Sequence, residues 1–550
     1  MRPALPAALV AAPLLLAAPA PPPARPQTPS RPALLLVISV DQLSADVLAR
    51  YGRDLPGGLG QLQREGLRFT AAYHDHAFTE TGPGHSVLLS GRHPSSTGIP
   101  ENNWLDKATG RKLNCVEDAK VTTFGKGAAA RGASQALFHG TGLGDWLQAQ
   151  VKGSRVYTVS GKDRASILMG GARPTGAFWF EAGIGYTTST AYAERLPDWL
   201  AAQNAALLGR LRHESLYWTP LAPTSGLARN GTWQTKYGTF RGGLPRQINP
   251  MGMPLDEAFY HRFRASPYFD EATAQVAETL LETERLGQGE GTDLLAVGFS
   301  ATDYVGHFYG TAGDEMVDQV RRLDLLLGRF LADVKAKVPS VAVVLTADHG
   351  CTDLVERLAE QGYPAKRIDQ KVWVGELNAA LRRKFPALTA DPLTYTGMPK
   401  NLYLREVAGA SKEDLLQEAL SVLRRMPDVA AAFSAAELAA AEDDPSPNPR
   451  GHSLKTLLKH STVPGRSGDI LVTLKPYTFF ADDPPYIVQH GFPYDADRRV
   501  PLIFWGPWQP GERPEPVRTV DLAPTLAREL GIAPAGKLDG APLDLARKAK

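Results

Sequence analysis

Residues 34–40 read LLLVISV, and Asp41 follows them directly. An apolar run of this length without polar alternation is typical of a strand that is buried on both faces, as strands of a parallel sheet are. Comparable runs recur at residues 155–160 (RVYTVS), 294–300 (LLAVGFS), 340–346 (SVAVVLT) and 500–505 (VPLIFW). Together these runs predict a mostly parallel central sheet.

Helical periodicity separates the predicted strands. Before the run at 340–346, apolar residues recur every three or four positions, at Val317, Val320, Leu323, Leu327, Phe330 and Val334. This spacing predicts an amphipathic helix. The alternation of strands and helices predicts an α/β fold in which helices flank the sheet. Ligands of such folds bind at the carboxyl ends of the strands.

Two stretches interrupt the alternation, and we expect them to be inserted cap regions of a single catalytic domain at residues 33–550. Residues 170–265 are rich in Gly, Pro, Trp and Tyr and show little periodicity. Residues 360–465 contain a predicted helix at about 411–426, where Ser411 and Asp414 resemble a capping box.

The N-terminus has the pattern of an export signal. Arg2 supplies a positive start, and residues 7–18 (AALVAAPLLLAA) form an apolar run that is too short to span a bilayer. We therefore expect a signal peptide at 1–20, a Pro/Ala-rich linker at 21–32, and a periplasmic or secreted protein without a stable membrane span. A short membrane anchor or a disordered tail is the alternative.

The composition limits the partners. The chain carries 60 basic and 58 acidic residues, a formal charge of +2, and no long basic run, so we expect no nucleic-acid-binding surface. Small anionic substrates remain compatible with this balance, and we expect a monomer. The two cysteines, Cys115 and Cys351, are too few for a zinc cage. We expect buried free thiols, with one disulfide as the alternative.

Side chains that can bind metals follow several predicted strands. They are three carboxylates and three imidazoles: Asp41, Asp303, His307, Asp348, His349 and His490. Oxygen and nitrogen ligands of this kind suit Zn²⁺, with Mn²⁺ and Fe²⁺ as alternatives. Each short motif alone is weak evidence, and the set gains force because its members meet at strand ends. We expect other histidines, such as His213, His261 and His452, to be surface or packing residues.

Two pairs of these candidates are close in sequence. Asp303 and His307 are four residues apart, so one helical turn after the strand can bring both to one metal ion. Asp348 and His349 are adjacent, and a regular strand would point them to opposite faces. They can share a metal ion only if the chain has left the strand, which Gly350 would allow.

Residues 78–90 (FTETGPGHSVLLS) supply a candidate nucleophile. We expect Thr81 at the N-terminus of a buried helix, where free amide groups and the helix dipole favour an anion. Coordination to a metal would lower the pKa of the Thr81 hydroxyl and activate it. The alternative is that Thr81 only caps the helix. Thr79 and Ser86 are competing hydroxyls, and we expect His85 to be structural.

Three further side chains are candidates for binding a phosphoryl group. Lys162 and Arg164 lie two residues apart in GKDR, and in an extended chain they would project to the same side. Arg would grip two oxygens as a fork and Lys would act as a point charge. A solvated turn is the alternative. Asn102 offers an amide donor, with Asn103 as its rival.

These motifs together resemble the alkaline phosphatase superfamily. The resemblance is closest to its PafA-like, phosphate-irrepressible branch, within the wider phosphodiesterase/nucleotide pyrophosphatase group. It extends over nearly the whole chain, through VISVDQ, TGPGHS, GIPENNW, GKDR, GFSATDYVGH, LTADHG and HGFPYDADRRVPLIFWG. This chain has TGPGH where the family has TAPGH, and Cys351 where a small residue usually follows DHG.

The resemblance implies a zinc-dependent phosphatase with a covalent phospho-threonine intermediate on Thr81 and many phosphomonoester substrates. The implied ligands of one Zn²⁺ are Asp303, His307 and His490. The implied ligands of a second Zn²⁺ are Asp41, Asp348, His349 and the oxygen of Thr81. The residues implied to bind the phosphoryl oxygens are Asn102, Lys162 and Arg164. In this branch the Lys–Arg pair resembles a replacement for a third metal site and marks a preference for monoesters.

Two rival functions remain at this stage. The nearest is a phosphodiesterase or nucleotide pyrophosphatase on the same fold, which needs room for a second ester group where Lys162 and Arg164 would grip a dianion. The other is a non-catalytic metal-binding or phosphate-binding protein. A sulfatase is less compatible, because neither CxPxR nor SxPxR surrounds Thr81.

Overall fold

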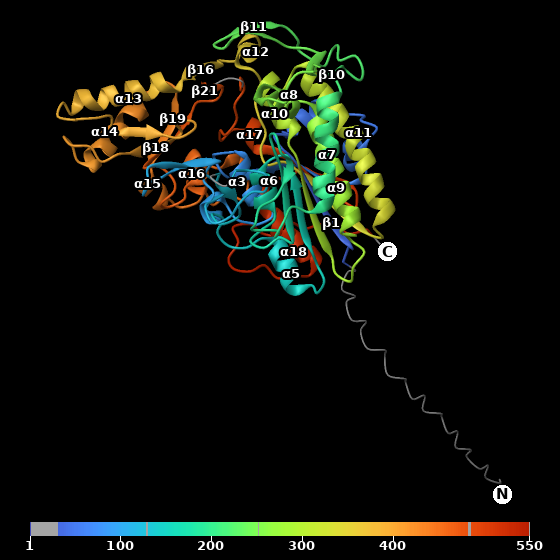
Figure 1. The fold of residues 1–550 in the computed structure, drawn as a ribbon. Helices are drawn as coiled ribbons and strands as arrows, with labels where there is room; N and C mark the ends of the chain where they lie inside the picture. Colours follow the sequence, from blue (N-terminus) through green and yellow to red (C-terminus); the bar gives the residue numbers. More distant parts are fainter. Residues whose placement is uncertain (2–30, 128–129, 251, 482–485, 549–550) are drawn as a thin grey trace. The chain divides into compact units, whose positions relative to one another are not determined.

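Strand β1 (Leu34–Val40), which Figure 1 labels, lies inside a ten-stranded sheet. The strand order is β23-β2-β22-β15-β1-β14-β7-β8-β9, and β24 pairs with β2. In this computed structural model β1 pairs in parallel with β14 (Asp293–Phe299) and with β15 (Val341–Thr346). Strand β14 pairs in parallel with β7 (Val156–Ser160), and β7 with β8 (Gly176–Glu181). The predicted mostly parallel sheet is confirmed.

Two strands outside the central parallel block, β22 and β9, run in the opposite direction to their neighbours. Strand β22 (Arg499–Trp505) covers the predicted run at 500–505, but it is antiparallel to both β15 and β2 (Leu67–Tyr73). Strand β9 (Gly185–Thr187) is antiparallel to β8. The parallel block is therefore central, and it carries the strand ends at which the sequence predicted ligands.

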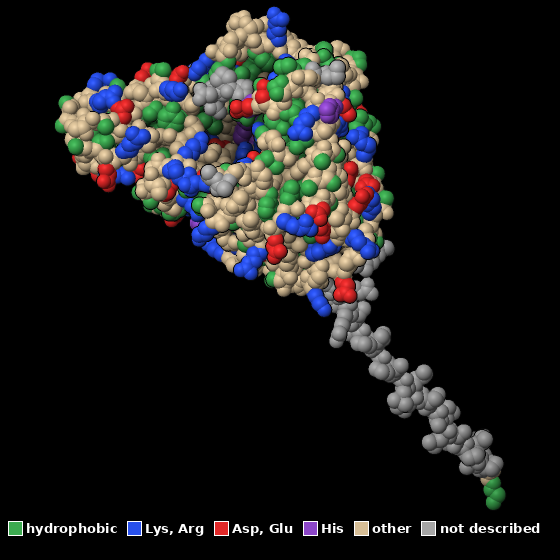
Figure 2. Space-filling model, in the orientation of Figure 1, with side chains coloured by type: hydrophobic (Ala, Val, Ile, Leu, Met, Phe, Trp, Pro, Cys, Tyr) green, Lys and Arg blue, Asp and Glu red, His purple; other side chains and the backbone are tan. Residues whose placement is uncertain are grey.

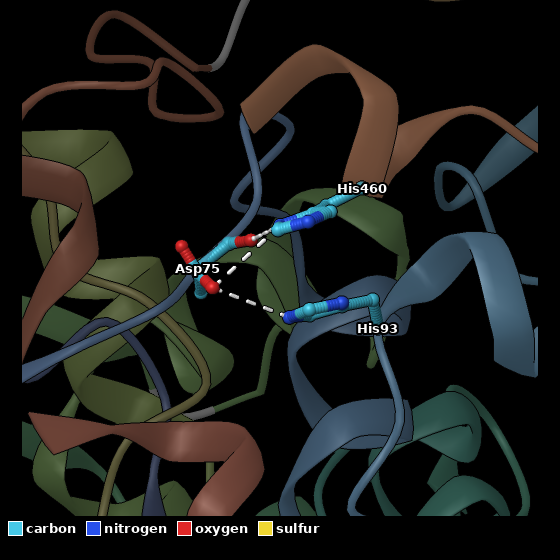
Figure 3. Close-up of side chains that lie close together, drawn as sticks. All are labelled: Asp75, His93 and His460. Atoms are coloured by element: carbon cyan, nitrogen blue, oxygen red, sulfur yellow. Dashed lines mark hydrogen bonds and ion pairs between the residues drawn. The ribbon is translucent and has the colours of Figure 1, made fainter. Parts of the chain in front are cut away.

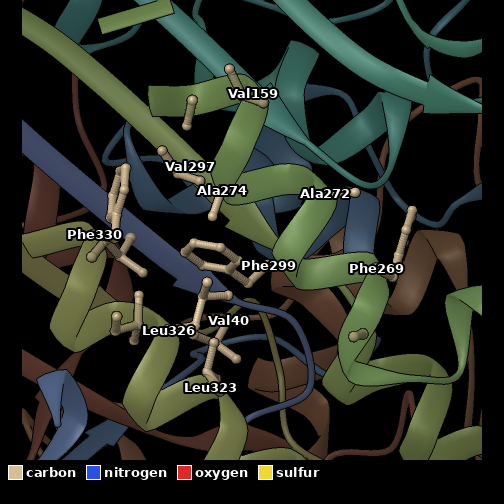
Figure 4. Packing of buried hydrophobic residues seen from close by; sticks show 14 of the residues in the cluster. Val40, Val159, Phe269, Ala272, Ala274, Val297, Phe299, Leu323, Leu326 and Phe330 are labelled. Carbon is tan, nitrogen blue, oxygen red and sulfur yellow. The ribbon is translucent and has the colours of Figure 1, made fainter. Parts of the chain in front are cut away.

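Two helical layers cover the two faces of the sheet. Leu34 and Leu36 of β1 belong to the apolar cluster that contains α9 (Pro267–Thr283) and α11 (Asp314–Lys337), whereas Leu35 belongs to the opposite cluster. The opposite cluster contains α5 (Leu143–Gln150) and α18 (Leu522–Leu530). Figure 4 shows Val40 and Phe299 of the sheet packed against Leu323 and Phe330 of α11, the helix that the periodicity predicted. Burial on both faces explains why β1 is apolar throughout.

A smaller four-stranded sheet lies within and beyond the second expected insertion, 360–465. Its order is β17-β18-β20-β19, and helices α13 and α14 pack on its apolar cluster. Helix α14 begins after Ser411, whose Oγ accepts a hydrogen bond from the Asp414 amide at 3.1 Å, as the capping pattern predicted. The bounds are β17 (Leu393–Tyr395), β18 (Asn401–Leu404), β19 (Val429–Ser434), β20 (Ile470–Leu474), α13 (Gln370–Lys384) and α14 (Lys412–Arg425).

The first expected insertion, 170–265, needs a correction at its start. Strands β8 and β9 fall inside this range and belong to the central sheet, so an inserted region begins no earlier than residue 188. Their short, mixed sequences gave no periodic signal. The placement of both insertions otherwise stays a prediction.

The structure describes residues 1, 31–127, 130–250, 252–481 and 486–548, and the elements above all belong to one unit, Pro32–Lys550. The expected signal peptide at 1–20, apart from its first residue, and the linker up to residue 30 lie outside the described residues. Within the described ranges, no helix is both long and apolar enough to cross a membrane.

Candidate active site

Thr81 is the first residue of helix α3 (Thr81–Leu88), as predicted, and it is almost completely buried. Glu80, with extended backbone, occupies the N-cap position, so the alternative in which Thr81 caps the helix is wrong. Gly84 permits the position of this helix, because a Cβ there would lie 2.1 Å from the backbone oxygen of Asp348. The glycine thus lets α3 pack directly against a segment that carries candidate ligands.

Three imidazoles surround one carboxylate oxygen. Asp303 lies in the first turn of α10 (Ala301–Tyr309), and its Oδ1 is 3.4 Å from Nε2 of His307 one turn later. The Nε2 atom of His490 lies 3.5 Å from the same oxygen, and that of His349 lies 3.9 Å away. The sequence-predicted pair at 303 and 307 therefore meets two further histidines from distant segments.

The same hydrogen-bonding pattern orients all three imidazoles. Each Nδ1 lies within hydrogen-bonding distance of a backbone carbonyl oxygen, at 2.6 Å for His307, 3.0 Å for His349 and 2.8 Å for His490. A carbonyl only accepts, so each Nδ1 is a donor, and in a neutral imidazole this leaves the Nε2 lone pair for a ligand. The Nε2 atoms face Asp303. A hydrogen bond from Nδ1 to a carbonyl is the kind of contact that orients metal-binding histidines.

A second group contains two fully buried carboxylates, Asp41 and Asp348, with His85 between them. His85 Nε2 lies 3.4 Å from Asp41 Oδ1, and His85 Nδ1 lies 3.3 Å from Asp348 Oδ2. His349 Nε2 lies 3.2 Å from Asp348 Oδ2, so His349 contacts both groups. The adjacent residues 348 and 349 converge because β15 has already ended at Thr346.

Gly350 serves a different purpose from the one expected. Its backbone does not take the left-handed conformation, but a Cβ there would lie 2.1 Å from the backbone oxygen of Ala496. The residue therefore allows close packing of the loop that carries Asp348 and His349 rather than a special turn.

The donor set fits divalent metal ions. Among the residues that the structure describes, Asp41 Oδ1, Asp348 Oδ2 and His349 Nε2 are buried without a hydrogen-bond partner. Burial, and then the neighbouring carboxylate of Asp348, raises the pKa of Asp41 to about 6. Buried lone pairs and crowded carboxylates of this kind are costly unless a cation compensates them. Oxygen and imidazole nitrogen are the ligands that zinc prefers.

Lys162 connects the candidate nucleophile to both groups. Its Nζ lies 2.5 Å from Asp303 Oδ2, 3.1 Å from Asp41 Oδ2 and 3.3 Å from Thr81 Oγ1. Burial alone would lower the pKa of Lys162, but Asp303 and Asp41 outweigh it and the pKa is raised. A fixed positive charge thus lies beside the Thr81 hydroxyl.

The local geometry of Lys162 and Arg164 differs from the extended chain that the sequence suggested. Lys162 is the N-cap of α6 (Asp163–Met169), and Arg164 lies in the first helical turn. Both side chains nevertheless line one cavity. In the described part of the chain, Arg164 Nε is buried without a hydrogen-bond partner, so part of its guanidinium group is available to a ligand.

Asn102 is held beside the start of α3. Its side-chain Oδ1 accepts a hydrogen bond from the backbone amide of Gly82 at 2.7 Å. The backbone amide of Asn102 donates to Glu80 Oε2 at 2.7 Å. With Oδ1 engaged, Nδ2 is the donor that Asn102 offers to a ligand. Asn103, the rival, also lines the cavity.

The candidate active site opens into a cavity of about 260 Å³. Figure 2 shows a hollow with histidine side chains inside it on the face of the molecule that is drawn. The cavity lining includes predicted site residues from four segments: Asn102, Lys162, Arg164, Asp303, His307 and His490. A cavity of this size with cationic and metal-competent walls suits a small anionic group.

Sequence and structure comparisons identify the family. Residues 35–492 match the model of the type I phosphodiesterase/nucleotide pyrophosphatase family. The chain belongs to this family. Alkaline phosphatase PhoD of Zymomonas mobilis is 36% identical over 521 residues, which cover 93% of this chain and 88% of that protein. The relatives of this phosphodiesterase-family chain thus include proteins named as alkaline phosphatases.

Solved structures of one relative share the fold. The crystal structure of wild-type alkaline phosphatase PafA matches with a TM-score of 0.81 and 29% identity, covering 94% of this chain and 98% of that one. A PafA variant with a threonine, an asparagine, a lysine and an arginine replaced matches with a TM-score of 0.80 and 28% identity, at the same coverage. The resemblance to PafA-like phosphatases within the phosphodiesterase family is confirmed.

Gln42 is a site residue of this phosphodiesterase-family chain that sequence reasoning missed. It has a φ of 66°, a left-handed conformation that is uncommon for a residue with a side chain. Its backbone amide donates to Asp348 Oδ1 at 3.0 Å, and its side-chain Nε2 donates to Asp303 Oδ1 at 2.9 Å. Gln42 thus joins a carboxylate of each group. Its only sequence signal was its position directly after Asp41.

The two cysteines agree with the expected free thiols. Cys115 and Cys351 are both buried, and neither forms a disulfide in the described structure. Burial raises the pKa of both thiols, so they stay protonated and unreactive near neutral pH. Cys351 Sγ lies 3.5 Å from the backbone oxygen of Gln489, next to the candidate ligand His490.

Proposed function

We propose that this chain is an alkaline phosphatase that hydrolyses phosphate monoesters through a covalent phospho-threonine on Thr81. One observation carries the proposal: Lys162 Nζ contacts Thr81 Oγ1 while it is paired with carboxylates of both candidate metal groups. The ammonium group of Lys162 thus places the hydroxyl beside both candidate metal groups. The named alkaline phosphatases among its relatives support the same activity.

Two Zn²⁺ ions per chain complete the proposed site. Asp303, His307 and His490 would hold one ion. The second ion would be held by Asp41, Asp348, His349 and the Thr81 oxygen. When bound, the two ions would lower the pKa of the attacking hydroxyl and stabilise the charge of the leaving group. The buried, unpartnered atoms of Asp41, Asp348 and His349 support the second site. The Nε2 atoms of His307 and His490, which lie 3.4 and 3.5 Å from Asp303 Oδ1, support the first.

The protein's own residues carry out the group transfer. Thr81 gives up its hydroxyl proton and its Oγ1 attacks phosphorus; the bond to the leaving oxygen breaks, the alcohol departs with a proton, and the phosphoryl group is held as a threonine ester. Water then attacks the same phosphorus, the bond to Oγ1 breaks, a proton returns to Thr81 and inorganic phosphate leaves. Each displacement is in line, so two inversions retain the configuration. Asn102, Lys162 and Arg164 hold the phosphoryl oxygens, because positioning and charge stabilisation dominate such loose transition states.

The PafA variant adds support for these roles. Its four replaced residues are a threonine, an asparagine, a lysine and an arginine. The same four residue types converge here at Thr81, Asn102, Lys162 and Arg164.

The alternative is a phosphodiesterase or nucleotide pyrophosphatase on the same fold, the activities that the family model's description names. Lys162 and Arg164 discriminate between the two functions. They would bind the charged oxygens of a monoester, whereas in a diester one of those oxygens carries a second ester group. The test is to compare kcat/KM for an aryl phosphate and its methyl diester on zinc-loaded protein. We expect the monoester to react faster. A faster diester reaction would assign this chain to the phosphodiesterases.

We further propose that the protein acts as a monomer in the periplasm or outside the cell. The export-like pattern at residues 7–18 supports this location. Fractionation of the host cell, with activity measured in the periplasmic extract and the cytosol, tests it. Activity that stays in the cytosol contradicts the proposal.

A further inference from the structure

The active-site cavity is also lined by side chains that have no assigned role in binding the phosphoryl group. Two of them, Met398 and Tyr486, come from distant parts of the chain. Met398 lies in the connection between β17 and β18 of the smaller sheet, and Tyr486 lies four residues before His490. The alcohol part of a substrate has to lie against walls of this kind, because the phosphoryl group occupies the other residues.

Tyr486 and Met398 each lie beside a histidine of the same candidate metal group. The ring of Tyr486 packs against His307, with ring centroids 5.0 Å apart and an angle of 61° between the planes. The rings of His307 and His490 are themselves 4.9 Å apart. A Cβ on Gly491, the residue after His490, would lie 3.6 Å from Cε of Met398. One of the two side chains is therefore next to each imidazole.

The proposed reaction directs the leaving oxygen toward these two imidazoles. In-line displacement places that oxygen opposite Thr81 Oγ1, across the phosphorus atom. Thr81 is assigned to the second metal ion, so the leaving oxygen faces the group that contains His307 and His490. This step rests on the proposed function. It follows that the leaving alcohol passes beside Tyr486 and Met398.

The chemistry of the two side chains favours a flat aromatic group. Aromatic rings attract one another in offset or edge-to-face arrangements, and a thioether sulfur packs favourably against a ring. Tyr486 and Met398 are both half-buried, so part of each remains open to the cavity. Tyr486 is also held by Phe308, whose ring centroid is 5.6 Å from its own. A ring that is already held in place loses little freedom when a ligand binds.

The charges of the cavity do not suit a second anionic group on the leaving alcohol. Among the described residues that line the cavity, Lys162 and Arg164 are the only lysine and arginine, and both are assigned to the phosphoryl oxygens. Two acidic residues, Glu80 and Glu101, also belong to the lining. A carboxylate or a further phosphate on the leaving group would meet no additional lysine or arginine there.

Another cluster of acidic and imidazole side chains does not reach this cavity. Figure 3 shows its members, Asp75, His93 and His460, in contact with one another. His460 Nδ1 donates to the backbone oxygen of Asp75 at 2.6 Å, and the rings of His93 and His460 stack with centroids 3.8 Å apart. None of the three is among the described residues of the cavity lining. The cluster therefore supports the fold, and the choice of leaving group falls to the cavity walls.

We propose that Tyr486 and Met398 form a leaving-group subsite that favours flat, uncharged aromatic groups. Aryl phosphates are thus the preferred class among the phosphomonoesters that the site accepts. Both residues determine specificity, whereas the residues assigned to the metal ions and the phosphoryl oxygens serve every monoester alike.

A matched pair of substrates tests the proposal. Phenyl phosphate is compared with a fluorinated alkyl phosphate whose alcohol has the same pKa, so that the two differ in shape but not in the basicity of the leaving group. We expect Tyr486→Leu and Met398→Ala each to lower the ratio of kcat/KM for the phenyl ester to that for the alkyl ester about three- to tenfold. Tyr486→Phe keeps the ring and should retain the wild-type ratio. An unchanged ratio in both the leucine and the alanine variants overturns the proposal.

Tyr217→Leu, which changes an exposed tyrosine outside the cavity lining, is the control and should also retain the wild-type ratio. If the wild type hydrolyses neither ester, the proposed function fails and the subsite fails with it. If active variants keep the wild-type ratio, only the subsite fails. The two failures are therefore distinguishable.

A binding measurement on the unmodified, zinc-loaded chain covers the case in which a variant fails to fold. Phosphonates have no ester bond to hydrolyse, so calorimetry reports their binding alone. We expect phenylphosphonate to bind about tenfold more tightly than methylphosphonate, and 4-carboxyphenylphosphonate to bind more weakly than phenylphosphonate. Equal affinities for the phenyl and methyl compounds overturn the aromatic preference. Tighter binding of the carboxylate overturns the preference for an uncharged group.

Discussion

Lys400 Nζ lies 2.5 Å from Glu80 Oε1, and both residues are buried. Lys400 directly precedes β18 of the smaller sheet, whereas Glu80 directly precedes the nucleophile helix. The second oxygen of Glu80, Oε2, accepts a hydrogen bond from the backbone amide of Asn102. Burial would raise the pKa of Glu80, but Lys400 outweighs it, and the pKa is lowered. One ion pair therefore joins the smaller sheet to the proposed phosphoryl-binding asparagine.

Replacing Lys400 by Met should leave the Glu80 carboxylate buried without a counter-charge. We expect the free energy of unfolding to fall by about 3–5 kcal/mol. We also expect kcat/KM to fall about tenfold, because Asn102 loses its support. Urea unfolding and steady-state kinetics measure the two effects. The double variant Glu80→Gln/Lys400→Met should recover most of the stability, and a single variant as stable as the wild type would contradict this role for the pair.

Thr81→Ala should abolish the covalent intermediate. The variant keeps the helix but has no hydroxyl to attack phosphorus, so we expect kcat to fall by about 10⁴-fold or more. Acid quenching with a ³²P-labelled monoester measures the phospho-enzyme directly. Thr81→Ser is the matched control and should still become labelled. Label retained by the alanine variant would place the nucleophile elsewhere, with Thr79 and Ser86 the nearest candidates.

Arg164→Ala should reduce activity on monoesters more than on diesters. The guanidinium group would bind an oxygen that carries full negative charge only in a monoester, so we expect kcat/KM for the aryl phosphate to fall about 10²-fold. The methyl diester should lose much less. Arg173→Ala, an exposed arginine just beyond the same helix, is the control. Equal losses on both substrates would remove the assigned role.

Removal of metal should both inactivate and destabilise the protein. Without cations, Asp41, Asp303 and Asp348 crowd a fully buried space, which disfavours the folded state. We expect dialysis against a chelator to lower Tm and abolish activity, and Zn²⁺ to restore both. Mg²⁺ should not restore activity, because it prefers octahedral oxygen ligands. A chelated protein with full activity would contradict the metal assignment.

The effect of Asp497→Asn on stability should depend on pH. Burial raises the pKa of Asp497 to about 8, well above the usual value in an unfolded chain. The native state then keeps a proton that the unfolded state releases, so this residue favours folding below about pH 4 and loses that contribution as pH rises through 8. We expect the free energy of unfolding of the Asn variant, relative to the wild type, to rise between pH 5 and pH 8 and to level off above pH 8. Urea unfolding of both proteins at pH 5, 7 and 9 measures it, and a pH-independent difference would contradict the shift.

The sequence predicted the centre of the fold better than its edges. Runs of apolar residues identified β1, β7, β14 and β15, because strands covered on both faces have no polar alternation. The same signal identified β22 but not its reversed direction, since burial does not depend on strand polarity. Strands β8 and β9 were missed, because they lie in a stretch with little periodicity.

For the site, residue type and position at a strand end were sufficient to nominate Asp41, Asp303 and Asp348. The supporting contacts were not predictable in this way. Gln42 and Lys400 act through contacts with residues hundreds of positions away or in other elements, and their types are common everywhere in the chain. We expected His452 to be an ordinary surface or packing histidine. It contacts Asp75, and this contact was not predictable because the two residues are far apart in the sequence.

The central place of β1 ties activity to the completion of protein synthesis. Residues 34–40 leave the ribosome long before β14 and β15, the two strands on either side of β1, have been made. His490 emerges later still. A nascent or truncated chain therefore carries the threonine but lacks the partners that would activate it.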